Sequence, residues 1–332
     1  MPHGLKNHTE LSACFFNPRG IFLFFCKART GKRFNNDQNV MMPETFHQQY
    51  PSRLSVLLIL FLIAAPLYGL VGFLGNFSSS KWPVLLGEML LPLPAYLFLR
   101  FRHYNARQIF RLHPVSRRLM YLSAGLAVAL HLVIYEIDLL FTALWSSIWR
   151  LLPPEFSLLS PEVLRAQLEQ ALIAQSLLDW AIIILATVVV AGIFEEMLFR
   201  GFVQTAFEQR HKISTAIIIT AAIFAANHAV PWWLAQIFLL GLGLGWMARQ
   251  SDSIIPGAIV HGINNFFAVL FVNFKTAPSW LFWPNAQSWL GAGHLHPILL
   301  FIAGAAIYFG LKLFQRYCEE ETEIPTFFNS PG

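Results

Sequence analysis

Charged side chains are scarce in this chain of 332 residues. Asp, Glu, Lys and Arg together make up 12% of it, about half the ~25% that is typical of soluble proteins. Apolar residues make up 56%, and the mean hydropathy is +0.53. A soluble fold of this size could not bury so much apolar surface. The composition therefore excludes a disordered protein and an ordinary cytosolic enzyme, and it predicts an integral membrane protein.

The chain also lacks the motifs of soluble catalytic and redox folds. Its three cysteines, Cys14, Cys26 and Cys318, show no metal-binding or redox spacing, and we interpret them as free thiols. No Gly-rich phosphate loop, GxSxG motif or HExxH motif is present. These absences exclude a phosphate-binding loop, a nucleophile elbow of the GxSxG type and a standard zincin site.

Long apolar runs are abundant, and they predict the fold class: an all-α integral membrane protein. A helix needs about 20 apolar residues to cross the hydrocarbon core. Eight runs are predicted to be spans: 54–76, 82–101, 119–140, 174–209, 213–230, 232–249, 254–274 and 297–316. The connection 150–172 is predicted to be an amphipathic exterior segment. The connection 275–296 contains Trp280, Trp283 and Trp289, which suit a membrane interface.

Lys and Arg are distributed unevenly between the two sides of these spans. Nineteen of the 23 are counted on one side, including six from Arg100 to Arg118 and also Arg200 within the fourth span, and four lie on the other. The positive-inside rule therefore predicts that both termini and the 102–118 loop are cytosolic, as an even number of spans requires. The same rule explains the net charge of +5 without a nucleic-acid partner.

The predicted domain organisation is one membrane domain between two tails. Residues 1–50 are interpreted as an N-terminal cytosolic tail, or as the result of a start site assigned too far upstream, with the true start near Met41. Residues 51–317 form the multi-span domain, and residues 318–332 form a short acidic C-terminal tail.

Acidic side chains within the spans are candidates for function, because an ionised group at the centre of a membrane helix costs at least about 2.5–3.5 kcal/mol. The candidates are Glu88, Glu136, Asp138, Asp179, Glu195 and Glu196. Glu136, Asp138 and Asp179 lie near span ends and can reach the membrane interface. Glu88 is deeper and has no evident partner, so we interpret it as a buried, hydrogen-bonded carboxyl group.

Glu195 and Glu196 differ from the others because apolar sequence surrounds them in AGIFEEMLFRGF. Glu196 and Arg200 are four residues apart on one helical face, in the favoured order for an ion pair. Glu195 lies about 100° around the helix and has no local partner. Such a carboxylate, facing a cavity, is suited to take a proton from water.

His228 follows in IFAANHAV and is predicted to lie at the depth of Glu195. If the fourth and fifth spans form an antiparallel hairpin, residues at equal depth are equally distant from the turn. The midpoint of Glu195 and His228 falls in the polar turn EQRHKIS. Each residue is then about 25 Å from the turn along its helix. The fourth span is therefore expected to continue past Arg200 into the cytosol.

His261 and Asn265 form a third polar pair, four residues apart in PGAIVHGINNFF, whereas Asn264 points elsewhere. His261 is nearer to a cytosolic loop than His228 is, and the sequence does not resolve this difference in depth. Together with Glu195 these residues supply a base, a second water-orienting group and donors for an oxyanion.

Two kinds of chemistry are possible for Glu195, His228, His261 and Asn265. Glu195, His228 and His261 could hold zinc, with Glu196 as the base. Alternatively, Glu195 acts on water directly, without a cofactor. We favour the metal-free interpretation for two reasons. Glu196 is expected to pair with Arg200, so it is not free to act as the base of a zinc mechanism. Asn265 lies one turn from His261, and the two suit a pair of hydrogen-bond donors better than a metal site.

The three motifs EExxxR, FxxxH and HxxxN resemble those of the CAAX protease and bacteriocin-processing family, in the same order on membrane helices. Here they comprise Glu195, Glu196 and Arg200, then Phe224 and His228, then His261 and Asn265, within the motif core 175–275. The glycine after His261 departs slightly from the alanine often found there.

The resemblance implies an intramembrane glutamic endopeptidase related to the type II CAAX prenyl endopeptidase. It implies about eight spans around a polar cavity open to the cytosol, with Glu195 as general base helped by His228. His261 and Asn265 would form the oxyanion site, and Glu196 and Arg200 would support it. The implied partners are membrane lipid and a peptide or membrane-protein substrate.

We therefore predict a multi-pass peptide hydrolase of the cell membrane, of the bacterial inner membrane in particular. Three alternatives of another class stay open: a non-catalytic membrane scaffold, an immunity protein and a transporter. A transporter would more often show repeated halves with broken helices, and no repeat is visible. The substrate and the cleavage site are not indicated by the sequence.

Overall fold

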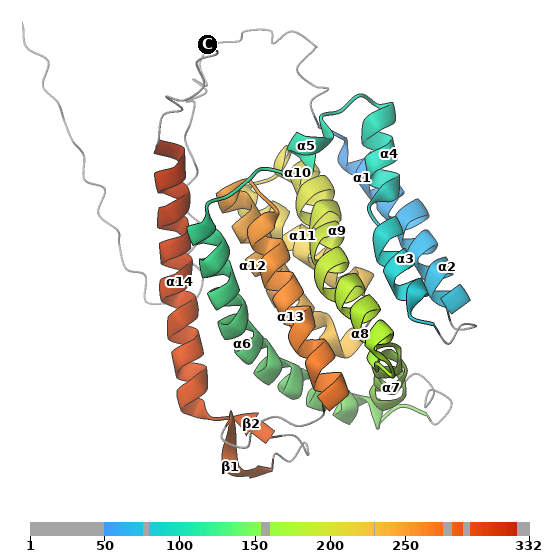
Figure 1. Cartoon of the computed structure of the whole chain (residues 1–332), viewed down its shortest axis with the longest axis vertical. Coiled ribbons are helices and arrows are strands. Elements are labelled where there is room, and N and C mark those ends of the chain that lie inside the picture. The colour runs from blue at the N-terminus through green and yellow to red at the C-terminus, as the bar shows by residue number, and fades with distance from the viewer. Residues whose placement is uncertain are drawn as a thin grey trace, which may run out of the picture. The chain divides into compact units, whose positions relative to one another are not determined.

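Helices make up most of the part of the chain that the computed structural model describes (Figure 1). The structure describes residues 50–75, 80–153, 160–228, 230–274, 281–287 and 293–323. These residues lie in the unit formed by residues 44–332. The predicted tail lies outside the described residues up to position 49, together with Met41, Cys14 and Cys26. Trp280 and Trp289 of the connection 275–296 also lie outside them. The predicted all-α membrane fold is confirmed.

The helical elements follow one another with few long connections. In chain order they are α1 (Arg53–Ile59), η2 (Leu60–Ala64), α2 (Ala65–Gly75), α3 (Trp82–Leu90), α4 (Leu93–Phe101), α5 (Ala106–Ile109), α6 (Arg117–Trp149), α7 (Pro161–Leu172), α8 (Leu177–Ile183), η4 (Ile184–Val190), α9 (Ala191–Glu196), η5 (Met197–Val203), α10 (Gln204–Glu208), α11 (Ile213–Asn227), η6 (Pro231–Trp233), α12 (Leu234–Ser251), α13 (Ile255–Phe274) and α14 (Pro297–Glu323). The elements η2, η4 and η5 are π-helical, and η6 is a 3₁₀ turn.

Serine side chains begin four of these helices. Ser52, Ser116, Ser160 and Ser176 each accept a hydrogen bond from the backbone N–H three residues later. Such a cap satisfies one of the free donors of a helix start. Asp179 completes the cap of α8, since its carboxylate accepts a hydrogen bond from the N–H of Gln175 at 3.0 Å. The acidic group near this span end therefore caps a helix.

Among the described residues, seven helices are long and apolar enough to cross a membrane: Arg53–Phe73, Trp82–Phe101, Arg117–Trp149, Leu177–Glu208, Pro231–Ser251, Ile255–Phe274 and Pro297–Glu321. Each corresponds to a predicted span. The remaining predicted span, 213–230, is the shorter helix α11 of 15 residues. At 1.5 Å per residue it is about 22 Å long and ends at His228. Many large apolar side chains are exposed, for example Phe101 and Phe301, as expected where lipid replaces water.

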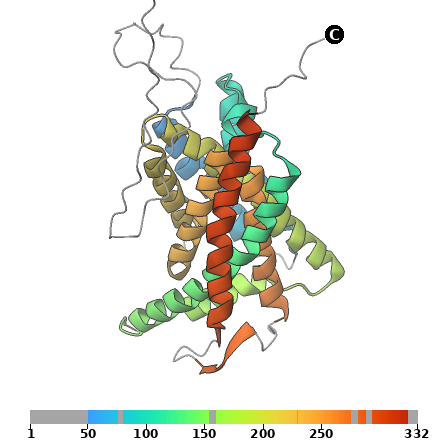
Figure 2. The same cartoon turned by 90° about the vertical axis from the view of Figure 1, so that its left-hand side faces the viewer.

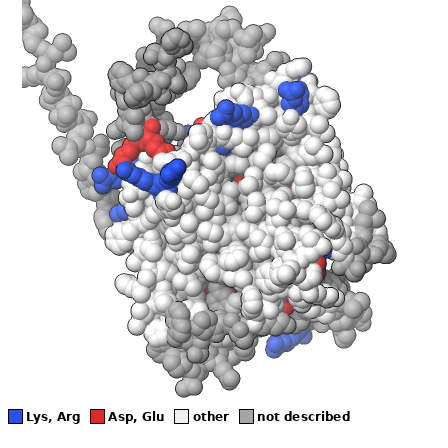
Figure 3. All heavy atoms as spheres, in the orientation of Figure 1, with Lys and Arg blue, Asp and Glu red and all other residues white. Residues whose placement is uncertain are grey.

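The polar connections meet at one end of the helices, called here the arginine-rich end. Arg111 contacts Glu208 and Asp252, and Arg53 contacts His211. These contacts place the loop 102–118 beside the ends of α10 and α12, and the start of α1 beside the turn that follows α10. In Figure 3, blue Lys and Arg side chains gather at this end, and the visible middle of the bundle carries almost no charge.

A short hairpin lies at the opposite end, where the sequence predicted only a connection. Strand β1 (Phe282–Gln287) pairs with β2 (Gly293–Leu295) in antiparallel fashion. Glu136 of α6 accepts a hydrogen bond from the N–H of Leu295 at 3.2 Å and pairs with His294. Glu136 therefore attaches the hairpin to α6. Figure 2 shows the hairpin below α14, which packs along α6.

The helix from α8 to α10 lies in the centre of this bundle. Its residues Leu198, Phe199 and Phe202 are fully buried, in one cluster with apolar residues of α1, α4 and α11. On its other side α13 packs against η4 and α9. Helix α9 carries both glutamates of the EExxxR motif, so the fold surrounds them with other spans.

Candidate active site

Glu195 and Glu196 lie on a helix whose hydrogen bonding changes on both sides of them. The six α-helical residues of α9 stand between the π-helical segments η4 and η5, each of seven residues. A π-helix bonds to the fifth residue along, is rare, and often occurs at functional sites. The sequence contained no signal that predicted these segments.

Glu196 belongs to a closed cluster of ionisable side chains. Its Oε1 lies 3.1 Å from Nη1 of Arg200 and 3.2 Å from Nδ1 of His261. Glu196 and Arg200 are fully buried, and His261 is 3% exposed. The predicted pairing of Glu196 with Arg200 is therefore present in the structure. Since a buried charge is costly unless it is paired, this cluster supplies the neutralisation that Glu196 needs.

Glu195, the neighbouring residue, has a different environment. Its Oε2 lies 3.9 Å from Nε2 of His228, and their side chains are 12% and 30% exposed, respectively. This distance is too long for a direct hydrogen bond. The two side chains lie side by side at the depth that the helical-hairpin argument predicts. Among the described residues, Oε2 of Glu195 has no hydrogen-bond partner.

The orientation of His228 follows from its place at the end of α11. Its Nδ1 lies 2.8 Å from the carbonyl oxygen of Phe224, one of the carbonyls that a helix end leaves without a helical partner. A carbonyl can only accept, so Nδ1 carries a proton and donates it. In the neutral ring Nε2 then carries the lone pair, and this nitrogen faces Glu195.

Phe224 lies between the two environments. Its ring meets His228 edge to face at 4.7 Å and His261 at 5.8 Å, and the guanidinium of Arg200 lies 4.1 Å from its centre. An aromatic face attracts such a cation. The phenylalanine of the FxxxH motif therefore separates the closed cluster from the pair of Glu195 and His228.

The HxxxN residues contact the motif helix at two places. His261 contacts Glu196, which is one residue nearer to the arginine-rich end than Glu195. The two histidines thus face different glutamates of α9. Asn265 lies one turn further along, and its Nδ2 donates to the carbonyl of Thr187 in η4 at 2.9 Å. Asn264 points elsewhere, as predicted, and contacts Nδ1 of His131 at 3.0 Å.

Glycines permit these close contacts between helices. A Cβ atom on Gly262 would lie 2.7 Å from the carbonyl oxygen of Val188, and one on Gly257 would lie 2.8 Å from Oε2 of Glu196. A Cβ atom on Gly201 of the FRG sequence would lie 2.7 Å from Cα of Phe110. Gly262 has no side chain, and this lets α13 approach η4.

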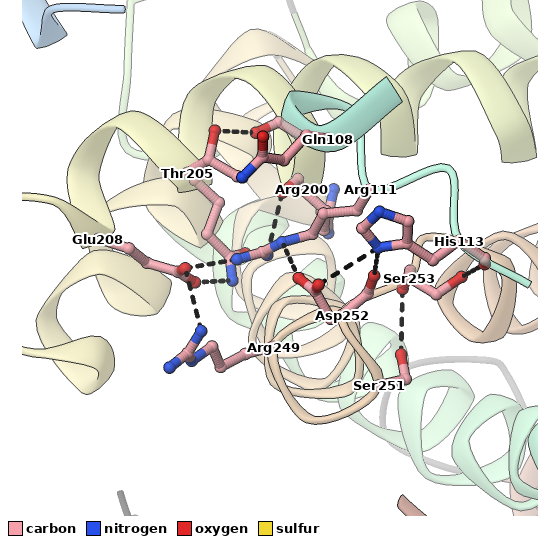
Figure 4. Close-up of polar contacts among 12 residues, drawn as sticks. Gln108, Arg111, His113, Arg200, Thr205, Glu208, Arg249, Ser251, Asp252 and Ser253 are labelled. Atoms are coloured by element: carbon pink, nitrogen blue, oxygen red, sulfur yellow. Dashed lines mark hydrogen bonds and ion pairs between the residues drawn. The ribbon is translucent and has the colours of Figure 1, made fainter. Parts of the chain in front are cut away.

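Arg111 ties the arginine-rich loop to the motif helix (Figure 4). Its Nη1 donates to the backbone carbonyl of Arg200 at 3.1 Å, its Nη2 contacts Glu208, and its Nε lies 3.6 Å from Asp252. The guanidinium is almost fully buried. This network attaches the loop to the backbone of Arg200, in the buried ion pair, and to Glu208 at the end of α10.

Glu88 is a further acidic group near Glu195 that the sequence did not connect with it. It is buried, and its Oε1 accepts a hydrogen bond from the hydroxyl of Tyr68 at 2.8 Å. Both side chains are within electrostatic range of Glu195. The sequence does contain a signal for this pair, because the midpoint of positions 68 and 88 falls in the connection between α2 and α3 and the two residues therefore share a depth.

The sequence left open a zinc site formed by Glu195, His228 and His261. Among the residues that the structure describes, no group of three His, Cys, Asp or Glu side chains is placed to hold a metal ion. His261 faces Glu196, and His228 faces Glu195.

The comparisons with known proteins agree with the motifs. Residues 177–267 match the family described as Rce1-like, type II CAAX prenyl endopeptidase Rce1-like. The comparisons with curated proteins and with solved structures found no match to the chain. The matched segment begins with α8 and ends within α13, so it contains all three motifs and both glutamate environments. Over this segment, the chain is similar to the Rce1-like family of CAAX proteases.

Proposed function

We propose that this membrane protein is an intramembrane endopeptidase that hydrolyses a peptide bond of a membrane-associated protein or peptide. One observation carries the proposal: Glu195 is partly accessible and lies 3.9 Å from His228, whereas Glu196 beside it is buried and paired. A carboxylate and an imidazole nitrogen at this separation can both reach one water molecule. The family match supports peptide hydrolysis as the reaction.

In the proposed reaction, Glu195 takes a proton from water while Nε2 of His228 orients that water. The water oxygen attacks the peptide carbonyl carbon, and the carbonyl oxygen becomes an oxyanion. His261 and Asn265 lie one turn apart on α13 and are proposed to donate hydrogen bonds to this oxyanion. The proton held by Glu195 then passes to the leaving amine as the carbon–nitrogen bond breaks. No cofactor takes part in the proposed reaction.

The remaining motif residues are proposed to support the site. Glu196 and Arg200 neutralise one another and fix the helix that carries Glu195. We further propose that the arginine-rich end faces the cytosol, from the distribution of Lys and Arg. A reporter fused after residue 110 should then have a cytosolic location, and an exterior location would reverse the orientation.

The test uses the full chain purified in detergent. It is incubated with a library of membrane-anchored peptides, including peptides with a prenylated cysteine near the C-terminus, and products are identified by mass spectrometry. The wild type should cleave a subset of the library, and the matched variant Glu195→Ala should cleave none while melting at the same temperature. Equal cleavage by both would refute the assignment of Glu195.

A further inference from the structure

A cavity lies at the arginine-rich end, outside the cluster of the three motifs. Its volume is about 630 Å³, and it opens where the start of α1, the segment after α4 and the end of α10 meet. Seven polar side chains line it: Arg53, Arg102, Arg210, Tyr50, Tyr104, Gln209 and Ser52. Three of these are arginines from three separate segments, and the lining contains no Asp or Glu.

The three guanidinium charges have no carboxylate partner among the residues that the structure describes. The acidic residue nearest to Arg210 in sequence is Glu208, which turns toward Arg111 and Arg249 instead (Figure 4). Arg53 does have a partner, because its Nη1 donates to Nε2 of His211 at 2.7 Å. A guanidinium can only donate, so that imidazole nitrogen accepts and brings no negative charge.

The lining favours a phosphate group over other anions. Guanidinium groups bind phosphate oxygens through paired, charge-assisted hydrogen bonds. Arginines that approach from three segments match a tetrahedral anion better than a planar carboxylate. Tyr50 adds a donor, because its hydroxyl oxygen accepts from Nε2 of Gln108 at 3.1 Å and its own proton is left to donate.

Two apolar stripes begin beside these arginines and point to a lipid as the source of the phosphate. One stripe follows Arg53 along the first span, and the other leads to Arg102 along α4. Their members are exposed and recur every four residues, so each stripe lies on one helical face: Leu54, Leu58 and Leu62, and Leu93, Leu97 and Phe101. A phosphate held in the cavity would therefore place acyl chains along exposed apolar surface.

We propose that this cavity binds the phosphate headgroup of an anionic membrane lipid. Basic pockets between the ends of membrane helices are suited to such headgroups. The lipid would join the first two spans to the end of the helix that carries the EExxxR motif, since Arg53, Arg102 and Arg210 belong to these three elements. This site is separate from the proposed peptide hydrolysis and does not depend on it.

The experiment measures lipid binding by native mass spectrometry of the full chain, which requires no catalytic activity. The probe is phosphatidylglycerol, and phosphatidylcholine is the zwitterionic comparison. The pocket variant is Arg53→Gln/Arg102→Gln/Arg210→Gln. The matched control is Arg100→Gln/Arg107→Gln/Lys212→Gln, which removes the same charge from exposed residues at the same end but outside the lining.

Each pocket arginine should contribute about fivefold to the affinity, so the pocket variant should bind phosphatidylglycerol roughly a hundredfold more weakly. The control should change by less than about threefold on the same scale. The single variant Arg210→Gln, with a loss of about fivefold, keeps the test decisive if the triple variant does not fold. An equal loss in pocket variant and control, or no loss in either, would overturn the proposal. Full displacement of the lipid by inorganic phosphate would instead show a site for a soluble anion and would also overturn it.

Discussion

Two glutamates that are adjacent in sequence have opposite environments in this protein. Glu196 is fully buried between Arg200 and His261, and its second oxygen lies against Gly257. Glu195 is partly exposed, and its ionisable neighbour, His228, lies 3.9 Å away on another helix. One step of about 100° around a helix separates the two environments.

The comparison shows how a membrane helix can carry two charges for two purposes. A carboxylate that is paired and buried fixes the packing of helices, because removal of either partner leaves an uncompensated charge. A carboxylate that is partly open and loosely paired can exchange a proton with water. The same residue type therefore serves as a structural contact at position 196 and as the proposed base at position 195.

The largest expected effect comes from breaking the closed cluster. Arg200→Met leaves Glu196 buried without its cation and should lower the free energy of unfolding by about 3–5 kcal/mol. Thermal unfolding in detergent measures this loss. The double variant Glu196→Gln/Arg200→Met removes both charges and should recover at least half of it. A double variant as unstable as Arg200→Met would show that packing, and not charge, explains the loss.

A smaller effect is expected where α13 approaches η4. Gly262→Ala places a methyl group against the carbonyl of Val188 and should lower the free energy of unfolding by about 1–3 kcal/mol. It should also lower activity, since His261 is the preceding residue. Gly243→Ala on α12 is the matched control, because nothing lies within 4 Å of its Cβ position. Equal effects of the two variants, measured by unfolding and by peptide cleavage, would contradict the close-contact explanation.

The pH dependence of cleavage distinguishes the proposed base from a structural carboxylate. Glu195 must be ionised to accept a proton, so kcat/KM should be full at high pH and should fall as the pH falls. Below the titration of one group the fall should be about tenfold per pH unit. The measurement is a pH–rate profile over a range in which the melting temperature stays constant. A rate that rises as the pH falls would contradict Glu195 as the base.

Removal of metal ions should have the smallest effect. In the metal-free mechanism, EDTA and phenanthroline should leave cleavage unchanged within about twofold, since no step uses a Lewis acid. Loss of activity with chelator, followed by recovery with one equivalent of zinc, would overturn this mechanism. His228 and His261 would then be reassigned as ligands.

Composition and hydropathy predicted the spans well, because lipid solvation imposes a simple rule on helix length. Residues at equal distance from a turn also share a depth, and this predicted the approach of Glu195 to His228. The contact of His261 with Glu196 depends on helix packing through Gly262 and Gly257, which span lengths do not encode.

Other features follow from local hydrogen bonding. Apolar composition does not reveal the pattern of backbone hydrogen bonds. Three features depend on that pattern: the π-helical segments beside Glu195, the end of α11 at His228, and the β-hairpin. The hydrogen bond between Tyr68 and Glu88 does follow from the rule of equal depth, because both residues are almost equally far from the middle of the connection between α2 and α3.

The central claim is that Glu195, and not Glu196, activates water. The most direct measurement compares Glu195→Gln with Glu196→Gln in one preparation, recording both the melting temperature and the cleavage rate per folded molecule. Glu195→Gln should lose about 10²–10⁴-fold in rate without a loss of stability. Glu196→Gln should lose stability while the folded fraction still cleaves. A folded and active Glu195→Gln beside a folded but inactive Glu196→Gln would contradict the account.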